Sequence, residues 1–296
     1  MYNVVRRRGR DSGHEARGRG KDERSPLLSE PASRSESAEF VELCLLDRLQ
    51  QDAAVAFDGD SIRHHEVLER LWVAAFPDAG PMQRPSDLWG ELGFQGRDPV
   101  TDLRGGGFMA LCHLLHVVLA GESEIRAALP MLAIASINVT AMLQSHLGLN
   151  EKVMLPGGCE RIWAPQHTQS AFLAVHGRDE GALAAMHLAL VCHLARVWLG
   201  MEADAAAAGG APLTVMQFPA ALQATHRHMQ RVLLSAPIPW RMADVLADLR
   251  WGPMETTASD GGGLGALFWL CMVFVHRKLC CCDSCCTTTV PKRAGA

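Results

Sequence analysis

Arg104 stands in the segment of the chain that carries the densest signals for a constrained loop. Before it, the Asp98-Pro99 dipeptide fixes an extended or turn backbone, because the proline ring restricts the residue that precedes it. Thr101 and Asp102 are helix-capping residue types, and either can cap a helix that starts near the following leucine. Arg104 would then lie in the first turn of that helix.

A guanidinium group in the first turn of a helix lies beside the positive end of the helix dipole, which is unfavourable by roughly 0.3–1 kcal/mol. This position therefore calls for a compensating negative charge. Either Asp98 or Asp102 neutralises Arg104 and thereby orients the loop, or Arg104 points at an anion on another molecule. In the second case its planar donors suit a phosphate or a carboxylate.

Other patterns argue against nucleotide or metal chemistry by the chain itself. Residues 105–107 are three glycines, but no Gly-Lys-Ser/Thr follows and no strand precedes them, so we expect close helix packing there rather than a phosphate-binding loop. The histidine pairs lack a metal-ligand spacing; they are His64 and His65, His113 and His116, His187 and His193, and His226 and His228. We expect no metal site and no cofactor of the chain's own.

Composition and charge bound the domain organisation. The chain has 296 residues, 48% of them hydrophobic, and a net charge of −4, which fits one domain of about 200 residues with terminal segments and gives no sign of nucleic-acid binding. Residues 1–37 combine clustered arginines with few apolar groups and should be disordered. This basic arm could contact anionic lipid or nucleic acid, although a solvated tail is the simpler interpretation. Residues 38–258 form the predicted domain, and residues 259–296 form a separate tail.

Apolar residues recur at three- and four-residue steps through most of the predicted domain, which predicts an all-α, multi-helix fold. The expected helices cover residues 39–57, 63–76, a stretch beyond Arg104 to at least 118, 129–147, 181–199 and 215–234. The stretch beyond Arg104 should be the central core helix, because its apolar stripe is broad. The expected loops are residues 157–169 and 205–212. In the first helix the expected core-facing residues are Phe40, Leu43, Leu46, Leu49 and Ala53.

Several side chains in the domain are expected to be core anchors, namely Trp72, Trp89, Trp198 and Phe94. Gln95 has two interpretations, a contact with a partner or a buried amide that holds the loop backbone. The chain shows no apolar signal segment after its first methionine, which favours an intracellular protein. The scattered cysteines agree with reduced thiols at apolar positions; they are Cys44, Cys112, Cys159 and Cys192.

The predicted tail has its own pattern. Residues 264–275 are apolar but fall short of the roughly 20 residues that span a bilayer, so this run could insert partway or pack on the domain. A basic cluster and five cysteines follow it: Cys280, Cys281, Cys282, Cys285 and Cys286. Cysteines in this setting suit S-palmitoylation, and several acyl chains would hold the protein on a membrane surface. A zinc site and an unmodified reduced tail are the alternatives.

Residues 89–105 resemble the signature of the ELMO (engulfment and cell motility) domain. The matching positions are Trp89, Gly93, Phe94, Gln95, Gly96, Asp98, Pro99, Thr101, Asp102, Arg104 and Gly105. Flanking similarity extends the resemblance over about residues 61–236. The resemblance implies that Arg104 is the catalytic group and that the other positions contact the partner or support the loop. Two positions depart from the family pattern, Leu103 and Gly106, and are expected to loosen the support of Arg104.

Small ELMO-domain proteins of this kind act as GTPase-activating proteins for Arf and Arl GTPases. The resemblance therefore implies a regulator rather than an enzyme, because the GTPase supplies the GTP, the Mg²⁺ and the hydrolytic site. The expected partners are an Arf- or Arl-family GTPase and a membrane surface, with a cytoplasmic, membrane-peripheral location. The alternative is a noncatalytic scaffold that binds a small GTPase or a Rac exchange factor.

Overall fold

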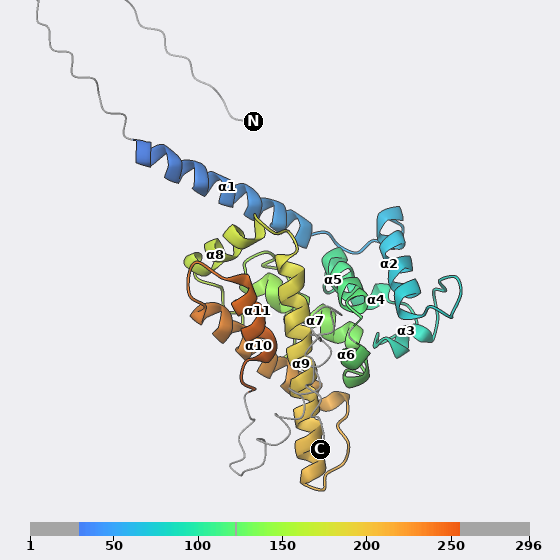
Figure 1. Cartoon of the computed structure of the whole chain (residues 1–296). Helices are drawn as coiled ribbons and strands as arrows, with labels where there is room; N and C mark the ends of the chain where they lie inside the picture. The colour runs from blue at the N-terminus through green and yellow to red at the C-terminus, as the bar shows by residue number, and fades with distance from the viewer. Residues whose placement is uncertain (1–29, 122, 255–296) are drawn as a thin grey trace, which may run out of the picture.

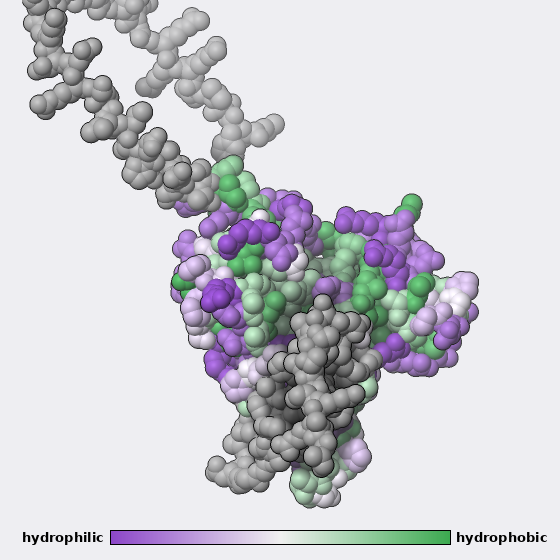
Figure 2. Space-filling view, in the orientation of Figure 1, coloured by the Kyte–Doolittle hydropathy of each residue, from purple (hydrophilic) through white to green (hydrophobic). Residues whose placement is uncertain are grey.

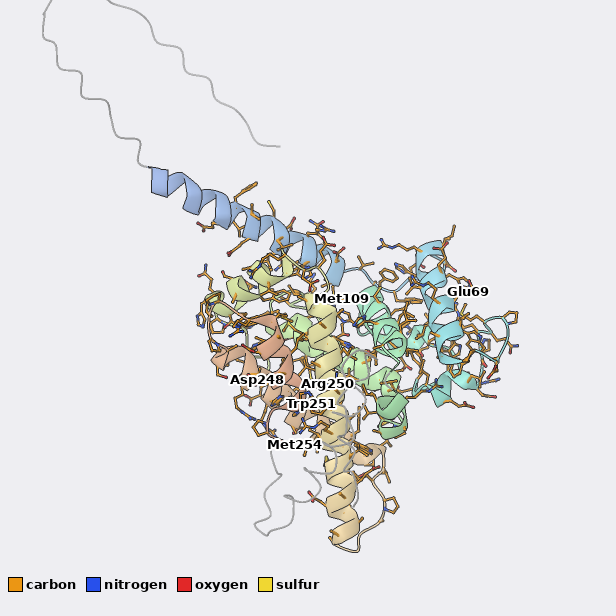
Figure 3. All side chains as sticks on the ribbon, viewed as in Figure 1. Glu69, Met109, Asp248, Arg250, Trp251 and Met254 are labelled. Carbon is orange, nitrogen blue, oxygen red and sulfur yellow. The ribbon has the colours of Figure 1, made fainter. Side chains whose placement is uncertain are left out.

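A computed structural model describes residues 30–121 and 123–254 of the chain (Figure 1). Most of the predicted N-terminal arm and the whole segment that contains Cys280, Cys281, Cys282, Cys285 and Cys286 lie outside the described residues. The described chain ends at Met254, which is labelled in Figure 3. Its methyl group packs beside Gly200, 3.7 Å from the position that a Cβ on this glycine would take.

Every regular element in the described ranges is a helix, which confirms the predicted fold class. The elements are α1 (Glu30–Ala53), α2 (Ile62–Ala75), α3 (Leu88–Glu91), α4 (Val100–Leu103), α5 (Gly107–Leu119), α6 (Ser123–Ala128), α7 (Leu132–His146), α8 (Gln166–His176), α9 (Ala182–Ala207), the 3-10 helix η1 (Val215–Gln217), α10 (Phe218–Ser235) and α11 (Met242–Trp251).

The helix α9 forms the centre of the domain. It contacts α5, α6, α7, α8, α10 and α11, and these helices surround it in Figure 1. Its length and apolar composition would also allow it to cross a membrane, but most of the relevant stretch is buried inside the domain. Burial of most residues from Ala182 to Trp198 explains the nearly continuous apolar sequence of this part, as expected for a core helix. The helix after Arg104, α5, is buried as well, but α9 takes the central position that was predicted for it.

The helix α1 differs from its prediction in both extent and orientation. It begins at Glu30, so residues 30–37 of the predicted disordered arm are helical. Leu49 and Ala53 are buried as expected, whereas Phe40 is 68% exposed and Leu43 is 59% exposed. The reason is visible in Figure 1, where the N-terminal part of α1 extends past α8, and Figure 2 shows apolar surface at this end.

Element boundaries elsewhere also shift from the sequence prediction. The segment 129–147 contains only α7, because Pro130 separates it from α6. The predicted loop 157–169 already contains the first turn of α8, and α9 continues to Ala207 into the other predicted loop. Cys192 is buried as expected, whereas Cys44 is exposed.

Candidate functional site

Arg104 lies at the C-terminal end of the one-turn helix α4, and not in the first turn of the following helix as predicted. Its backbone is helical (φ −57°, ψ −33°), and α5 begins only at Gly107. The break arises at Gly107, whose φ of +66° cannot continue a right-handed helix. The predicted conflict between Arg104 and the positive end of a helix dipole is therefore absent, because a helix C-terminus favours a cation.

The two carboxylates expected to neutralise Arg104 have other partners. Asp98 pairs with Arg84 (Oδ1 to Nε, 3.4 Å) and accepts the backbone N–H of Val100 at 3.1 Å. Asp102 Oδ2 accepts the backbone N–H of Gln95 at 2.7 Å. Arg104 is exposed, and its side chain forms no ion pair or hydrogen bond with another residue of the described ranges. The predicted structural salt bridge is thus not found there.

Thr101 and Asp102 hold the loop together instead of capping a helix. The Thr101 hydroxyl donates to the backbone carbonyl of Asp98 at 3.0 Å, and the Asp102 carboxylate joins the start of the loop to its end. Burial raises the pKa of Asp102, and the hydrogen bond from the Gln95 N–H opposes that rise. The segment from Gln95 to Arg104 is therefore closed by its own polar groups.

Glycines let the backbone beside Arg104 approach neighbouring elements closely. A Cβ on Gly106 would lie 2.5 Å from the Cβ of Ala110, and a Cβ on Gly107 would meet the carbonyl oxygen of Val55. That same carbonyl accepts the N–H of Phe108 at 2.9 Å. The loop between α1 and α2 is therefore fastened directly to the start of α5.

The two positions that depart from the family pattern, Leu103 and Gly106, are closely packed. Leu103 is fully buried, and Gly106 has no room for a side chain. Gly105, by contrast, is exposed, and the nearest atom to its added Cβ would be the carbonyl oxygen of Asp102 at 3.8 Å. Two of the three glycines after Arg104, Gly106 and Gly107, thus allow the backbone to pack closely on neighbouring elements. Close helix packing is what the sequence predicted for the triplet.

A cluster of buried aromatic side chains packs at the start of the loop. Trp89 is fully buried, and its ring centroid lies 5.0 Å from that of Trp72 and 5.7 Å from that of Phe94. Its indole N–H donates to the carbonyl of Gln83 at 3.0 Å. Pro99 is buried as well. The predictions of Trp72, Trp89, Trp198 and Phe94 as core anchors are confirmed.

A second attachment joins the loop to α7. Gly93 has a φ of +95°, and a Cβ there would lie 2.5 Å from the backbone of residues 131–132. The carbonyl of Leu92 accepts the N–H of Ala133 at 3.0 Å, and the carbonyl of Gly93 accepts that of Ile134 at 3.4 Å. Because Gly93 lacks a side chain, the loop backbone can lie against the first turn of α7.

Gln95 is exposed, so the interpretation of a buried amide is wrong. Only its backbone N–H is engaged, by Asp102. The sequence motif therefore separates into a buried half that holds the loop and an exposed half at the surface. The exposed half consists of Gln95, Thr101, Arg104 and Gly105.

Sequence reasoning missed one charged residue beside this loop. The Cζ atom of Arg63 lies 5.2 Å from the ring centroid of Phe108, four residues after Arg104. The side chain of Arg63 is exposed and has no ion-pair partner among the described residues. No local spacing links residue 63 to residue 104, so only the packing of α2 on α5 could show this contact.

Buried histidines line the helix interfaces without forming a metal site. The rings of His113 and His187 stack at 4.5 Å, and those of His193 and His228 stack at 3.8 Å. Burial lowers the pKa of His187 to about 4, and burial together with the charge of His228 lowers that of His193 to about 2. Within the described ranges no group of three or more His, Cys, Asp or Glu side chains could hold a metal ion.

Comparison with known proteins finds one matching family. The model of the ELMO/CED-12 family matches residues 47–218. The chain is 35% identical over 103 residues to ELMO domain-containing protein B of Dictyostelium discoideum, which is 32% of this chain and 36% of that protein. It is 38% identical over 100 residues to human ELMO domain-containing protein 2, which is 31% of this chain and 34% of that protein.

The similarity to a further relative is longer but weaker. The chain is 23% identical over 182 residues to ELMO domain-containing protein C of Dictyostelium discoideum, which is 60% of this chain and 29% of that protein. The chain therefore spans about a third of the length of these curated relatives. No solved structure matches the chain.

Proposed function

Because the chain belongs to the ELMO/CED-12 family, we propose that it activates GTP hydrolysis by an Arf- or Arl-type small GTPase, with Arg104 inserted into the partner's active site. The observation that carries this proposal is the state of Arg104. Its backbone is held by the closed loop and by the packed glycines, while its side chain is exposed and unpaired within the described ranges.

This combination suits a group that acts on another molecule. A guanidinium that already had a carboxylate partner would have to break that pair before it could bind a phosphate. Arg104 has no such pair to break, since Asp98 and Asp102 are engaged by Arg84 and Gln95. The rigid backbone also lowers the entropy that is lost when the side chain docks.

The chemistry needs nothing else from this chain. During hydrolysis, water attacks the γ-phosphorus and the bond to the bridging oxygen breaks, so negative charge develops on phosphate oxygens. The guanidinium of Arg104 donates two parallel hydrogen bonds to those oxygens and stabilises that charge. Such an arginine typically raises the rate by about 10³ to 10⁵, and the GTPase supplies Mg²⁺ and positions the water.

The test is single-turnover GTP hydrolysis by a panel of Arf and Arl GTPases with the full chain. We expect stimulation by the wild type and a loss of about 10³-fold or more with Arg104→Ala. Arg104→Lys should also be a poor activator, because lysine lacks the planar fork of donors. Arg241→Ala is the matched control, since Arg241 is an exposed arginine that pairs with Asp244 on α11.

Two outcomes would count against the proposal. Full stimulation by Arg104→Lys or Arg104→Ala would show that the arginine is not the active group. Absence of stimulation by a folded wild-type chain across the panel would favour the noncatalytic alternative, a module that binds a GTPase or a Rac exchange factor. Binding alone does not separate the two functions, so the rate of hydrolysis has to be measured.

A further inference from the structure

We propose that Arg63 is a second partner-contact arginine, which binds a carboxylate on the surface of the same GTPase and sets the affinity of the complex. This inference rests on the proposed function of Arg104. Arg63 is exposed, stacks on Phe108 and lacks an ion-pair partner in the described ranges. An unpaired arginine that is already held in place is suited to recognise an anion.

Two routes of contact connect Arg63 to the loop of Arg104. Along the first, the guanidinium of Arg63 lies over the ring of Phe108, which follows Arg104 by four residues. Along the second, Arg84 pairs with Asp98 in the loop, and its guanidinium lies 3.2 Å from where a Cβ on Gly59 would be, just before α2. Arg84 therefore lies between the loop that carries Arg104 and the segment that precedes α2.

The separation between Arg63 and Arg104 along this route is small compared with the width of a protein interface. Four residues span at most about 14 Å of chain between Arg104 and Phe108. A standard interface covers about 800 Å² on each partner, which is a patch about 30 Å across. A GTPase footprint of this size that covers Arg104 is wide enough to include Arg63 as well.

The stacking geometry assigns Arg63 a role different from that of Arg104. The guanidinium of Arg63 lies with its Cζ atom 5.2 Å from the centroid of the Phe108 ring, and among the described residues no acceptor pairs with its N–H donors, which stay available for a bidentate carboxylate. As long as Arg63 keeps this contact with Phe108, its side chain stays against α5 and does not reach into a nucleotide cleft as Arg104 can. Arg63 is thus placed to contact the protein surface around that cleft.

A second exposed arginine lies on the same helix as Arg63. Arg70 lies two turns after Arg63 on α2, is exposed, and has no ion-pair partner in the part of the chain that the structure describes. Burial raises the pKa of the Cys112 thiol on α5, and the charges of Arg63 and Arg70 oppose that rise, so both arginines lie on the side of α2 that is near Cys112. In Figure 3 the two helices lie side by side, with Glu69 marking α2 and Met109 marking α5. Carboxylates on the partner would pair with these two arginines, which share α2 with the exposed Glu66 and Glu69.

The test measures stimulated GTP hydrolysis against the concentration of the full chain, which gives a maximal rate and a half-saturating concentration. Arg63→Ala should raise the half-saturating concentration about tenfold, the size expected for one charge-assisted hydrogen bond, and leave the maximal rate within about twofold. Arg104→Ala should lower the maximal rate instead. Added salt should reduce the difference between wild type and Arg63→Ala, since exposed charges are screened.

Two further variants separate charge from packing. Arg63→Met keeps an apolar stem over Phe108 without the charge and should behave like Arg63→Ala. Arg63→Lys keeps the charge without the planar fork and should recover part of the affinity. Arg241→Ala, which removes an exposed arginine just before α11, should leave both parameters unchanged.

An unchanged half-saturating concentration in Arg63→Met and Arg63→Ala overturns the inference while stimulation by the wild type still supports the proposed function. A fall in maximal rate equal to that of Arg104→Ala also overturns it. If both variants keep wild-type saturation but lose binding to vesicles that contain an anionic lipid, the surface belongs to a membrane and not to the GTPase. Absence of stimulation by the wild type refutes the proposed function, and the inference falls with it.

Discussion

Replacing Gly107 with alanine tests whether the junction beside Arg104 is held as tightly as the structure indicates. Gly107 has a φ of +66°, and its added Cβ would meet the carbonyl oxygen of Val55. The left-handed conformation costs a non-glycine residue roughly 1–2 kcal/mol. Forcing a methyl group into close packing adds roughly 1–3 kcal/mol, because the Val55 carbonyl must move and its hydrogen bond from Phe108 weakens.

Gly209→Ala supplies the matched comparison. Its φ of +67° is nearly the same, but no atom lies within 4 Å of the added Cβ. Only the backbone cost of roughly 1–2 kcal/mol applies there. The difference between the two variants therefore measures the contact between the junction and the loop that contains Val55.

The assay is urea unfolding of the full chain followed by circular dichroism, with thermal unfolding as a second readout. We expect Gly107→Ala to lower the unfolding free energy by about 2–5 kcal/mol, or the melting temperature by roughly 10 °C for a domain of this size. The variant should also stimulate GTP hydrolysis less than Gly209→Ala does, because Arg104 lies three residues before the displaced backbone. Equal stability of the two alanine variants would refute the claim that the junction is packed against Val55.

Three further predictions concern the core, the histidines and the tail. Trp89→Ala should destabilise the domain by about 3–5 kcal/mol in urea unfolding, and Trp163→Ala by much less, because Trp89 is fully buried whereas Trp163 is 44% exposed. Burial lowers the pKa of His187 and of His226 to about 4 from 6.5, so both are neutral in the folded state and the unfolded state binds the extra protons. Stability should therefore be fully present above about pH 6.5 and fall as the pH drops toward 4, and a urea midpoint at pH 5 equal to that at pH 7.5 would contradict this. Acyl-exchange labelling of the full chain in cells should disappear when the five cysteines of residues 280–286 become serine; labelling that persists would rule out acylation of this cluster.

The sequence was sufficient for features that depend on local pattern. Periodic apolar residues identified the all-α fold, and the buried aromatic positions followed from their place in apolar stretches, as at Trp72 and Trp89. The capping residue types Thr101 and Asp102 were recognised from the sequence, but they close the loop on the backbone of Asp98 and Gln95 and do not cap a helix.

Features that depend on packing between distant segments could not be predicted in this way. The end of α4 at Arg104 follows from the conformation of Gly107, which is fixed by contact with Val55, about fifty residues earlier in the chain. The exposure of Phe40 follows from how far α1 extends past its neighbours. The stack of Arg63 on Phe108 likewise exists only because α2 packs on α5.

The central position of α9 has a consequence for how the domain opens. Because α9 contacts six other helices, its buried amides cannot reach solvent unless most of the tertiary structure is lost at once. Amide hydrogen exchange in the middle of α9 should therefore report global unfolding, whereas the part of α1 around Phe40 and Leu43 can separate from the body locally. The domain then behaves as one cooperative unit with an independent N-terminal extension, so a change at α1 can alter local opening without altering the platform that presents Arg104.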